Sequence, residues 1–305
     1  MRVITTPHVS EQAVLAALRE AFGDPSHAGP AGPGQFVVDL PGGGDVIHYP
    51  AVLPAAGIHA VKVSPYLPQP AGPAVVTAWT LLVSLSTGQP LALLDASGLT
   101  VERTAATTVL AVGLLLPPDA GTAAVVGYGR VGRAHARYLR HVRPGMTVRA
   151  FSPLGIEEAD DTVQAVHSLE EAVTGADLVM LCTSAAGDVL DPRDLPAGVV
   201  VTSISTNAPG AREIPSAAVP DLDVYVDART SLQVATELAQ AAASGWDPAT
   251  VRGDLAGLVA GRAPRPAGER PVYFRSVGLG IEDAAVAWAA YENGNDEATT
   301  EGRSG

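Results

Sequence analysis

The stretch Val125-Val-Gly-Tyr-Gly-Arg-Val-Gly132 decides the fold of this chain. It follows the apolar run Thr122–Val126 and leads into Arg133–His141, which we expect to be helical. A strand that turns through Gly-x-Gly-x-x-Gly into a helix is typical of dinucleotide-binding proteins, because the glycines permit a tight turn, close approach to a pyrophosphate and close helix packing. The alternative is a glycine turn with a structural role only. We predict cofactor contacts at Gly127, Tyr128, Gly129, Arg130, Val131 and Gly132.

Strands and helices continue to alternate after this turn. We expect strands at residues 148–151, 177–182 and 199–203, with a short helix at 169–174. Such alternation predicts an α/β layer with a doubly wound parallel sheet of the Rossmann type.

The segment before the turn has mostly the pattern of β-structure. After a helix at 10–22 that Ser10 caps, strand-like runs occur at 36–40, 46–49, 59–63, 78–85 and 90–94, the last two forming a hairpin. Thr100 is the expected N-cap of a helix that begins at Val101, so Arg103 is expected in its first turn. The last apolar helix is expected at 278–291.

Composition excludes several classes of protein. With 47% hydrophobic and 17% charged residues the chain is expected to be packed and globular, and its net charge of −13 argues against nucleic acid as a partner. No apolar run approaches the roughly 18 to 20 residues of a membrane span, and Met1–Pro7 lacks the apolar core of a secretory signal. The single cysteine, Cys182, fits a reducing cytoplasm. Histidine spacing shows no metal-ligand pattern.

The type of cofactor depends on the end of the second strand. NAD sites usually have an acid there, but this chain has Phe151-Ser-Pro-Leu-Gly155. Ser152 and Arg130 can accommodate a 2′-phosphate, so we predict NADP, with NAD as the alternative. Thr183 and Ser184 follow the third strand and Thr206 the fourth. We predict that they contact the cofactor, and a role in capping loops is the alternative.

Two cations are the candidates for substrate binding. Lys62 is the only lysine in 305 residues, and it lies in the apolar run His59–Val63. If Lys62 and Arg103 converge beside a nicotinamide, they form a clamp for a carboxylate. The alternatives are a lysine left by composition bias and an ion pair of Arg103 with Glu102 or a neighbour.

Motifs spread along the chain resemble those of the ornithine cyclodeaminase/mu-crystallin family. Beside the glycine turn, they are Val61-Lys-Val63, Ser86–Asp95, Leu99–Ala106, Asn207–Ile214, Val224–Asp227 and Phe274–Asp283. The resemblance implies a homodimer with a substrate and dimerisation domain (residues 1–112 and 275–293) and a Rossmann domain (113–274). It also implies that Lys62 and Arg103 hold a substrate carboxylate and that Ser276 and Gly278 lie near the nicotinamide. The polar C-terminal segment, residues 294–305, is expected to be a disordered tail.

The chain departs from the family at two positions. Gln35 stands where members often have an arginine that contacts the carboxylate, and Asn207 stands where cyclodeaminases have an acid/base aspartate. An amide does not exchange a proton at neutral pH, so cyclisation with loss of ammonia is disfavoured. Tyr49 is expected to line the substrate pocket, although relatives usually have an apolar residue there.

The resulting hypothesis is a cytoplasmic NAD(P)H-dependent oxidoreductase. It acts on the C=N or CH–NH bond of a small imino or amino acid, with Lys62, Arg103 and Asn207 as the catalytic candidates. One alternative is an ornithine or lysine cyclodeaminase. Another is a non-catalytic NADP-holding protein. The sequence leaves the substrate side chain, the physiological direction and the proton donor open.

Overall fold

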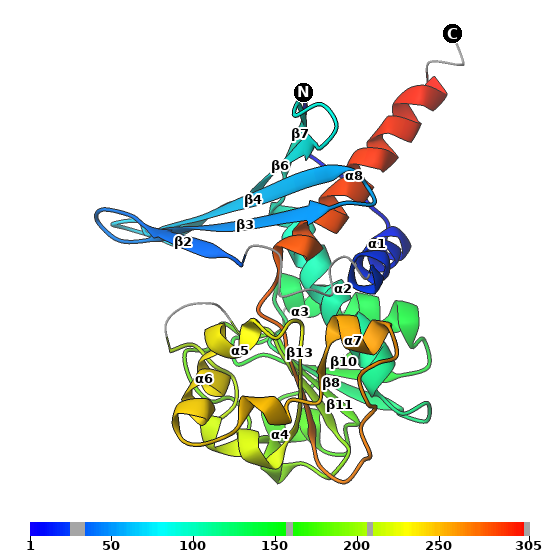
Figure 1. Cartoon of the computed structure of the whole chain (residues 1–305). Coiled ribbons are helices and arrows are strands. Elements are labelled where there is room, and N and C mark those ends of the chain that lie inside the picture. Colours follow the sequence, from blue (N-terminus) through cyan, green and yellow to red (C-terminus); the bar gives the residue numbers. More distant parts are fainter. Residues whose placement is uncertain (25–33, 157–160, 206–209, 302–305) are drawn as a thin grey trace. The chain divides into compact units, whose positions relative to one another are not determined.

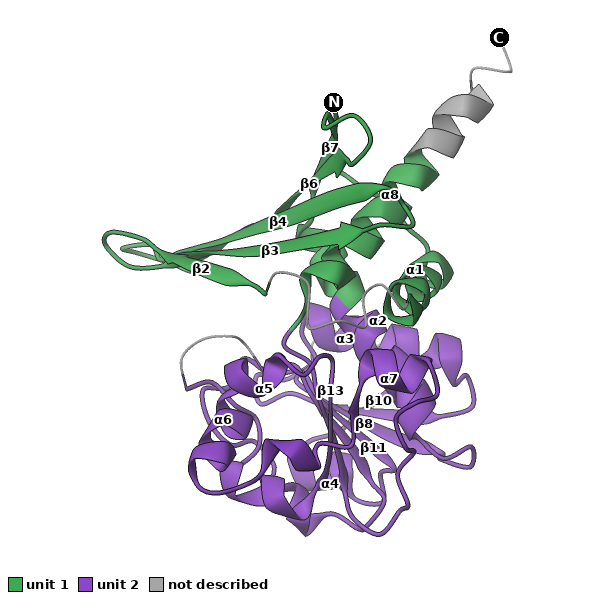
Figure 2. Cartoon of the chain, in the orientation of Figure 1, with its two compact units in different colours: residues 1–103, 278–305 green, residues 104–277 purple. Residues whose placement is uncertain are grey.

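The computed structural model describes residues 1–24, 34–156, 161–205 and 210–301, with side chains up to Gly294. Figure 1 shows how its helices and strands are arranged. The chain divides into two compact units (Figure 2). Unit 1 comprises residues 1–103 and 278–305, and unit 2 comprises residues 104–277. Unit 1 therefore unites the two ends of the chain.

A mixed sheet forms most of unit 1. Its strands lie in the order β1-β7-β6-β4-β3-β2, with β5 beside β4. Only β1 and β7 pair in parallel, and the other neighbours are antiparallel. The hairpin predicted from the sequence is confirmed as β6 and β7. The bounds are β1 (Arg2–Ile4), β2 (Phe36–Asp39), β3 (Asp45–Leu53), β4 (Ile58–Leu67), β5 (Val75–Val76), β6 (Trp79–Ser84) and β7 (Pro90–Asp95).

Among the described residues, two helices lie wholly within unit 1. Helix α1 (Glu11–Gly23) begins as predicted, because the Ser10 hydroxyl accepts a hydrogen bond from the Ala13 amide at 3.2 Å. Helix α8 (Gly280–Glu301) lies against β3, β4, β6 and α1. It continues past residue 291, where the sequence placed its end, since no proline interrupts the polar segment that follows.

Helix α2 (Ser97–Leu115) starts earlier than expected. The prediction that Thr100 caps it is wrong, because Asp95 Oδ1 accepts a hydrogen bond from the Ser97 amide at 2.9 Å. Thr100 lies inside the helix, and its hydroxyl donates to the Ala96 carbonyl at 2.8 Å. Arg103 is therefore in the second turn, where the helix dipole acts on it less than it would in the first.

The length and composition of α2 would suffice to cross a membrane, and it is the one such helix among the described residues. Of the apolar 18-residue stretch of this helix, 61% is buried within the protein, as in the core helix of a soluble fold.

Unit 2 is a parallel sheet with helices between its strands. The order β10-β9-β8-β11-β12-β15-β13-β14 confirms the predicted Rossmann-type architecture. The strands are β8 (Thr122–Val126), β9 (Thr147–Phe151), β10 (Val163–Ala165), β11 (Leu178–Leu181), β12 (Val200–Ser203), β13 (Asp223–Val226), β14 (Gly253–Asp254) and β15 (Val272–Arg275). The helices are α3 (Arg130–Val142), α4 (Leu169–Val173), α5 (Ser231–Val234), α6 (Thr236–Ala243) and α7 (Leu255–Val259), with 3-10 turns at Pro192–Asp194, Ser216–Asp221 and Pro248–Thr250.

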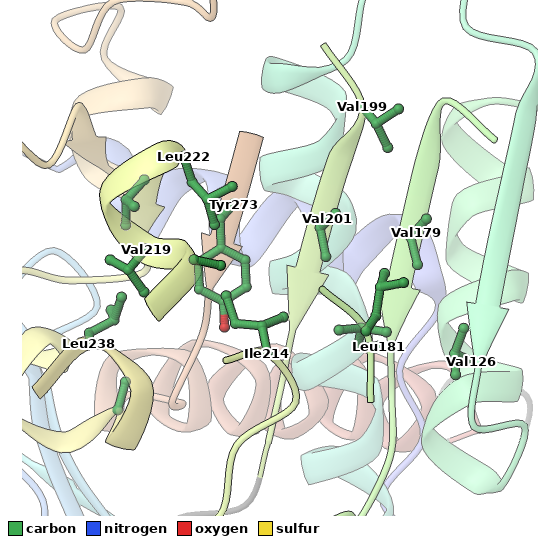
Figure 3. Packing of buried hydrophobic residues seen from close by; sticks show 14 of the residues in the cluster. Val126, Val179, Leu181, Val199, Val201, Ile214, Val219, Leu222, Leu238 and Tyr273 are labelled. Atoms are coloured by element: carbon green, nitrogen blue, oxygen red, sulfur yellow. The ribbon is translucent and has the colours of Figure 1, made fainter. Parts of the chain in front are cut away.

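One large cluster of buried hydrophobic residues in unit 2 lies on one face of this sheet. Figure 3 shows Val126, Leu181 and Val201 on neighbouring strands, packed with side chains from the segments that cover them. The strand order reverses between β8 and β11, which is where dinucleotides bind in open α/β sheets.

Candidate functional site

The structure brings Lys62 and Arg103 to the same carboxylate within unit 1. Lys62 Nζ donates to Asp283 Oδ1 at 2.9 Å, and Arg103 Nε donates to the same oxygen at 3.0 Å. Arg103 Nη1 also donates to Glu282 Oε2 at 2.8 Å. All four side chains are buried. We call these four residues the charged cluster.

The sheet explains why Lys62 points inward. On β4, Ile58, Ala60 and Lys62 alternate with more exposed residues, so the lysine occupies a position of the buried face. Its cross-strand neighbours are Tyr49 on β3 and Thr80 on β6. The Tyr49 ring centroid lies 4.3 Å from Lys62 Nζ, a cation–π contact. A polar residue on an apolar strand is thus enclosed by an aromatic ring and by a helix that carries two acids.

Burial and charge act in opposite directions on the two cations. Burial, assisted by the positive charge of Arg103, lowers the pKa of Lys62 to about 8, although the carboxylates of Asp283 and Glu282 oppose this change. For Arg103, burial disfavours the charged form, but Asp283 and Glu282 outweigh it and hold the guanidinium pKa above its ordinary value. Of the two cations, Lys62 is therefore the one whose pKa lies closer to neutral pH.

Gly278 makes room for the guanidinium of Arg103. Its φ is +84°, and a Cβ atom there would lie 2.4 Å from Arg103 Nη1 and 2.9 Å from Nη2. A side chain at this position would have to displace the guanidinium or shift the backbone. The sequence assigned Gly278 to the cofactor, and the structure adds that it packs against a substrate candidate.

The glycine turn of unit 2 has the geometry that the motif predicts. Gly127 has φ +89°, and a Cβ atom there would lie 2.5 Å from the Cys182 carbonyl oxygen. A Cβ atom on Gly132 would lie 2.0 Å from the Gly127 carbonyl oxygen. Gly129 precedes α3 and faces open space, since a Cβ atom there would meet nothing within 4 Å. The turn therefore leaves the start of α3 accessible to a pyrophosphate.

The other predicted cofactor residues around the turn vary in exposure. Arg130 is exposed at the start of α3, and Tyr128 is buried. Ser152 follows β9 and is half-buried, and its hydroxyl accepts a hydrogen bond from the Leu154 amide at 3.3 Å. Ser184 is exposed after β11. These positions lie at the carboxyl ends of strands in one sheet, as expected for residues that face a dinucleotide.

Glu213 is a residue that the sequence interpretation missed. Its Oε1 accepts from the Thr183 amide and hydroxyl, both at 2.7 Å. Its Oε2 accepts from the Ser203 hydroxyl at 2.7 Å and from the Ile204 amide at 3.2 Å. Burial raises the pKa of this carboxyl, and the hydrogen bonds from Ser203 and Thr183 oppose the change. Glu213 thus ties together the segments that follow β11 and β12, and Thr183 is held rather than free.

Ser276 belongs to a second hydrogen-bonded connection in unit 2, centred on the carboxylate of Asp227. Its hydroxyl donates to Asp227 Oδ2 at 3.1 Å, and the Val277 amide donates to the same oxygen at 2.7 Å. Asp227 Oδ1 accepts from the Ala228 amide and from the Ser231 hydroxyl. Asp227 therefore joins the end of β13 to the segment that follows β15, and the Ser276 hydroxyl is engaged in this connection.

Four predicted residues complete the comparison with the sequence. Tyr49 adjoins Lys62, as described above, whereas Gln35 is half-buried immediately before β2. Thr206 and Asn207 lie outside the described residues.

The chain is similar to known proteins along most of its length. The profile of the ornithine cyclodeaminase/mu-crystallin family matches residues 5–298. The NAD(P)H-dependent anabolic L-arginine dehydrogenase DauB of Pseudomonas aeruginosa is 46% identical over 288 residues, which are 91% of each chain. The ketimine reductase mu-crystallin of Mus musculus is 27% identical over 222 residues, 71% of this chain and 69% of the mouse protein. The structure of Thermococcus litoralis Δ1-pyrroline-2-carboxylate reductase with NADH and L-proline superposes with a TM-score of 0.86 at 23% identity and 98% coverage of both chains.

Proposed function

The chain belongs to the ornithine cyclodeaminase/mu-crystallin family, and on that premise we propose that it is an NAD(P)H-dependent oxidoreductase acting on the C=N or CH–NH bond of a small 2-imino or 2-amino acid. The observation that carries this proposal is the 46% identity, over 91% of both chains, to an NAD(P)H-dependent arginine dehydrogenase. The family membership confirms the resemblance inferred from the sequence motifs.

The structural support is the position of the two cations. Lys62 and Arg103 are buried and both donate hydrogen bonds to Asp283 Oδ1, so their charged groups lie close together. We propose that they bind a substrate carboxylate, Lys62 with its compact ammonium and Arg103 with its planar guanidinium. When bound, the reduced cofactor supplies the hydride. In this proposal Lys62 stabilises charge at the reacting centre, and Asn207 and Tyr49 are further candidates for substrate contact.

We propose L-arginine and its 2-imino form as the first substrates to test, because DauB is an L-arginine dehydrogenase. Two features of this chain agree with a cationic side chain. Gln35 supplies no third positive charge that would repel a guanidinium, and the net charge of −13 attracts cationic small molecules.

The cofactor assignment is NADP, with NAD as the second choice. The described residues after β9, Ser152 to Ile156, include no acid to repel a 2′-phosphate, and Arg130 is exposed beside the glycine turn. We assign the contacts of the cofactor to the glycine turn, residues 127–132, and to residues at the strand ends, namely Ser152, Thr183, Ser184, Thr206, Ser276 and Gly278.

We assign the protein to the cytoplasm as a homodimer. Strand β2 leaves Phe36, Val37 and Val38 exposed, and Val75 and Val76 of β5 are exposed on the same sheet. Such apolar strand residues favour pairing with a second copy of the chain.

The test is a turnover screen with purified protein. Oxidation of NADPH and NADH is followed with mixtures of 2-oxo acids and ammonia and with cyclic imines, and the reverse reaction with a panel of L-amino acids. Lys62→Met, which removes the ammonium but keeps bulk, is expected to lower kcat/KM by about 100-fold or more while dinucleotide binding persists. His59→Met, on the opposite face of β4, is the matched control and is expected to retain turnover.

Other outcomes separate the alternatives. Release of ammonia from ornithine or lysine without net change in the cofactor would identify a cyclodeaminase. Tight cofactor binding without turnover of any imine or amino acid would identify a binding protein. Full activity of Lys62→Met would remove the charged cluster from the mechanism.

A further inference from the structure

We propose that Asp283 is a positioning residue that fixes Lys62 and Arg103 at one point and keeps Lys62 in its ammonium form. The proposal rests on the proposed function for its catalytic consequence. Asp283 touches neither substrate nor cofactor in this scheme, and it acts through the two cations.

The geometry of hydrogen bonding singles out Asp283. Both cations donate to the same atom, Oδ1, at 2.9 Å from Lys62 and 3.0 Å from Arg103. The second oxygen, Oδ2, is buried and accepts no hydrogen bond from the described residues. One oxygen therefore sets the separation of two cations that come from a strand and a helix distant in sequence. A buried ammonium and a buried guanidinium would repel each other without this shared acceptor.

The groups around Lys62 come from four elements, and their charges can be added. Strand β3 contributes Tyr49, whose ring contacts the ammonium, and β6 contributes the uncharged Thr80. Helix α2 contributes Arg103, and α8 contributes Glu282 and Asp283. The two cations and two carboxylates sum to zero net charge. Removing either carboxylate leaves a buried excess of positive charge, which disfavours the ammonium form of Lys62.

Asp283 and its neighbour Glu282 differ in what they hold. Glu282 is also buried and lies one residue away on α8, and it accepts a hydrogen bond from Arg103 Nη1, whereas Asp283 accepts one from Lys62. Asp283 opposes the fall in the Lys62 pKa both by its charge and by its hydrogen bond, and Glu282 opposes it by charge alone and less strongly. The two acids therefore form a matched pair for experiment.

Lys62 can be observed directly, because it is the only lysine in the chain. Untagged protein labelled with 13C-lysine gives a single side-chain Cε signal from the polypeptide, and its chemical shift against pH reports the pKa of Lys62. In the wild type this signal is expected to titrate near pH 8. Asp283→Asn is expected to move the titration down by about one to three pH units, the usual effect of an adjacent opposite charge. Glu282→Gln is expected to move it by less.

The kinetic measurement uses the same variants with the substrate established by the turnover screen. The alkaline limb of kcat/KM against pH is expected to shift with the Lys62 titration in each variant, while the dinucleotide dissociation constant stays unchanged. A destabilised but otherwise unimportant aspartate would not move this limb. Asp283→Glu keeps the charge but displaces the oxygen, so its lysine pKa should stay near the wild-type value while kcat falls by about tenfold or more.

Two results would overturn the proposal. One is a Lys62 pKa that Asp283→Asn changes no more than Glu282→Gln does. The other, which also decides the matter if Asp283→Asn does not fold, is an unchanged kcat in Asp283→Glu. The NMR titration needs no turnover, so a wild-type protein that reduces no imine would refute the proposed function and leave the effect of Asp283 on Lys62 separately measurable.

Discussion

Replacing Gly278 with alanine should impair the site through Arg103. The new Cβ would lie 2.4 Å from Nη1, a distance that real Cβ contacts do not reach. The guanidinium cannot retreat freely, because Asp283 and Glu282 hold it on its Nε and Nη1 sides. We therefore expect Gly278→Ala to disrupt at least one of these charged hydrogen bonds.

The expected loss of stability has two parts. Alanine at φ +84° costs about 1–2 kcal/mol for the left-handed backbone conformation. Breaking one hydrogen bond between charged groups adds about 1.5–3 kcal/mol. The free energy of unfolding should thus fall by about 2.5–5 kcal/mol. The value of kcat/KM should fall by about 100-fold, since small displacements of positioning groups have effects of that size.

Two other glycines separate these contributions. Gly57 also has a positive φ, +65°, but a Cβ atom there would meet nothing within 4 Å, so Gly57→Ala should show the backbone cost alone and keep activity. Gly113 lies within α2 with open space around it, and Gly113→Ala should be neutral or stabilise the protein by up to about 1 kcal/mol. Urea unfolding by circular dichroism and steady-state kinetics measure both effects. Equal loss of stability in Gly278→Ala and Gly57→Ala, with full activity in both, would refute the reasoning.

Two predictions concern unit 2. Glu213→Gln retains the shape of the side chain but places an amide NH2 against the donors of Thr183 or Ile204. We expect the NADPH dissociation constant, measured by fluorescence titration, to rise by about tenfold or more. An unchanged constant would show that Glu213 does not shape the edge of the sheet where the cofactor is proposed to bind. His135 is buried with its Nε2 3.1 Å from the Thr108 hydroxyl, and burial lowers its pKa from 6.5 to about 4. The unfolded chain therefore binds the proton more readily, so stability should be full above about pH 6.5 and fall by about 3 kcal/mol as the pH drops to about 4. Urea unfolding across this range should show that part of the pH dependence in the wild type and not in His135→Gln.

Features of short range could be predicted from the sequence. The glycine turn, the β6–β7 hairpin and the Ser10 cap each depend on residues within a few positions of one another, and all three are present. The Thr100 cap was a local prediction that failed, because the helix begins at Ser97, four residues before the expected Val101, and the carboxylate of Asp95 accepts a hydrogen bond from the Ser97 amide. Asp95 and Thr100 lie close together in the sequence and both can cap a helix, and the sequence pattern alone did not show which of them does so.

The partners of the predicted cations could not be read from the chain. Lys62 was identified by its rarity and by its place on an apolar strand, but Asp283 lies 221 positions away from it. In the sequence Glu282 and Asp283 look like the acidic first turn of an exposed helix. The role of Glu213 could not be predicted either, because the sequence does not distinguish a buried glutamate that accepts four hydrogen bonds from a solvated one.

The sequence by itself determined the Rossmann-type layer, the family and the two cations, since these depend on local conformational preferences and on residue chemistry. Only the tertiary structure decided that one oxygen of Asp283 holds both cations and that Gly278 leaves space for Arg103. Those contacts form because α8, at the C-terminal end of the chain, packs against the sheet built by the N-terminal segment. Burial there brings the carboxylates of Asp283 and Glu282 close to Lys62, where they oppose the fall in its pKa.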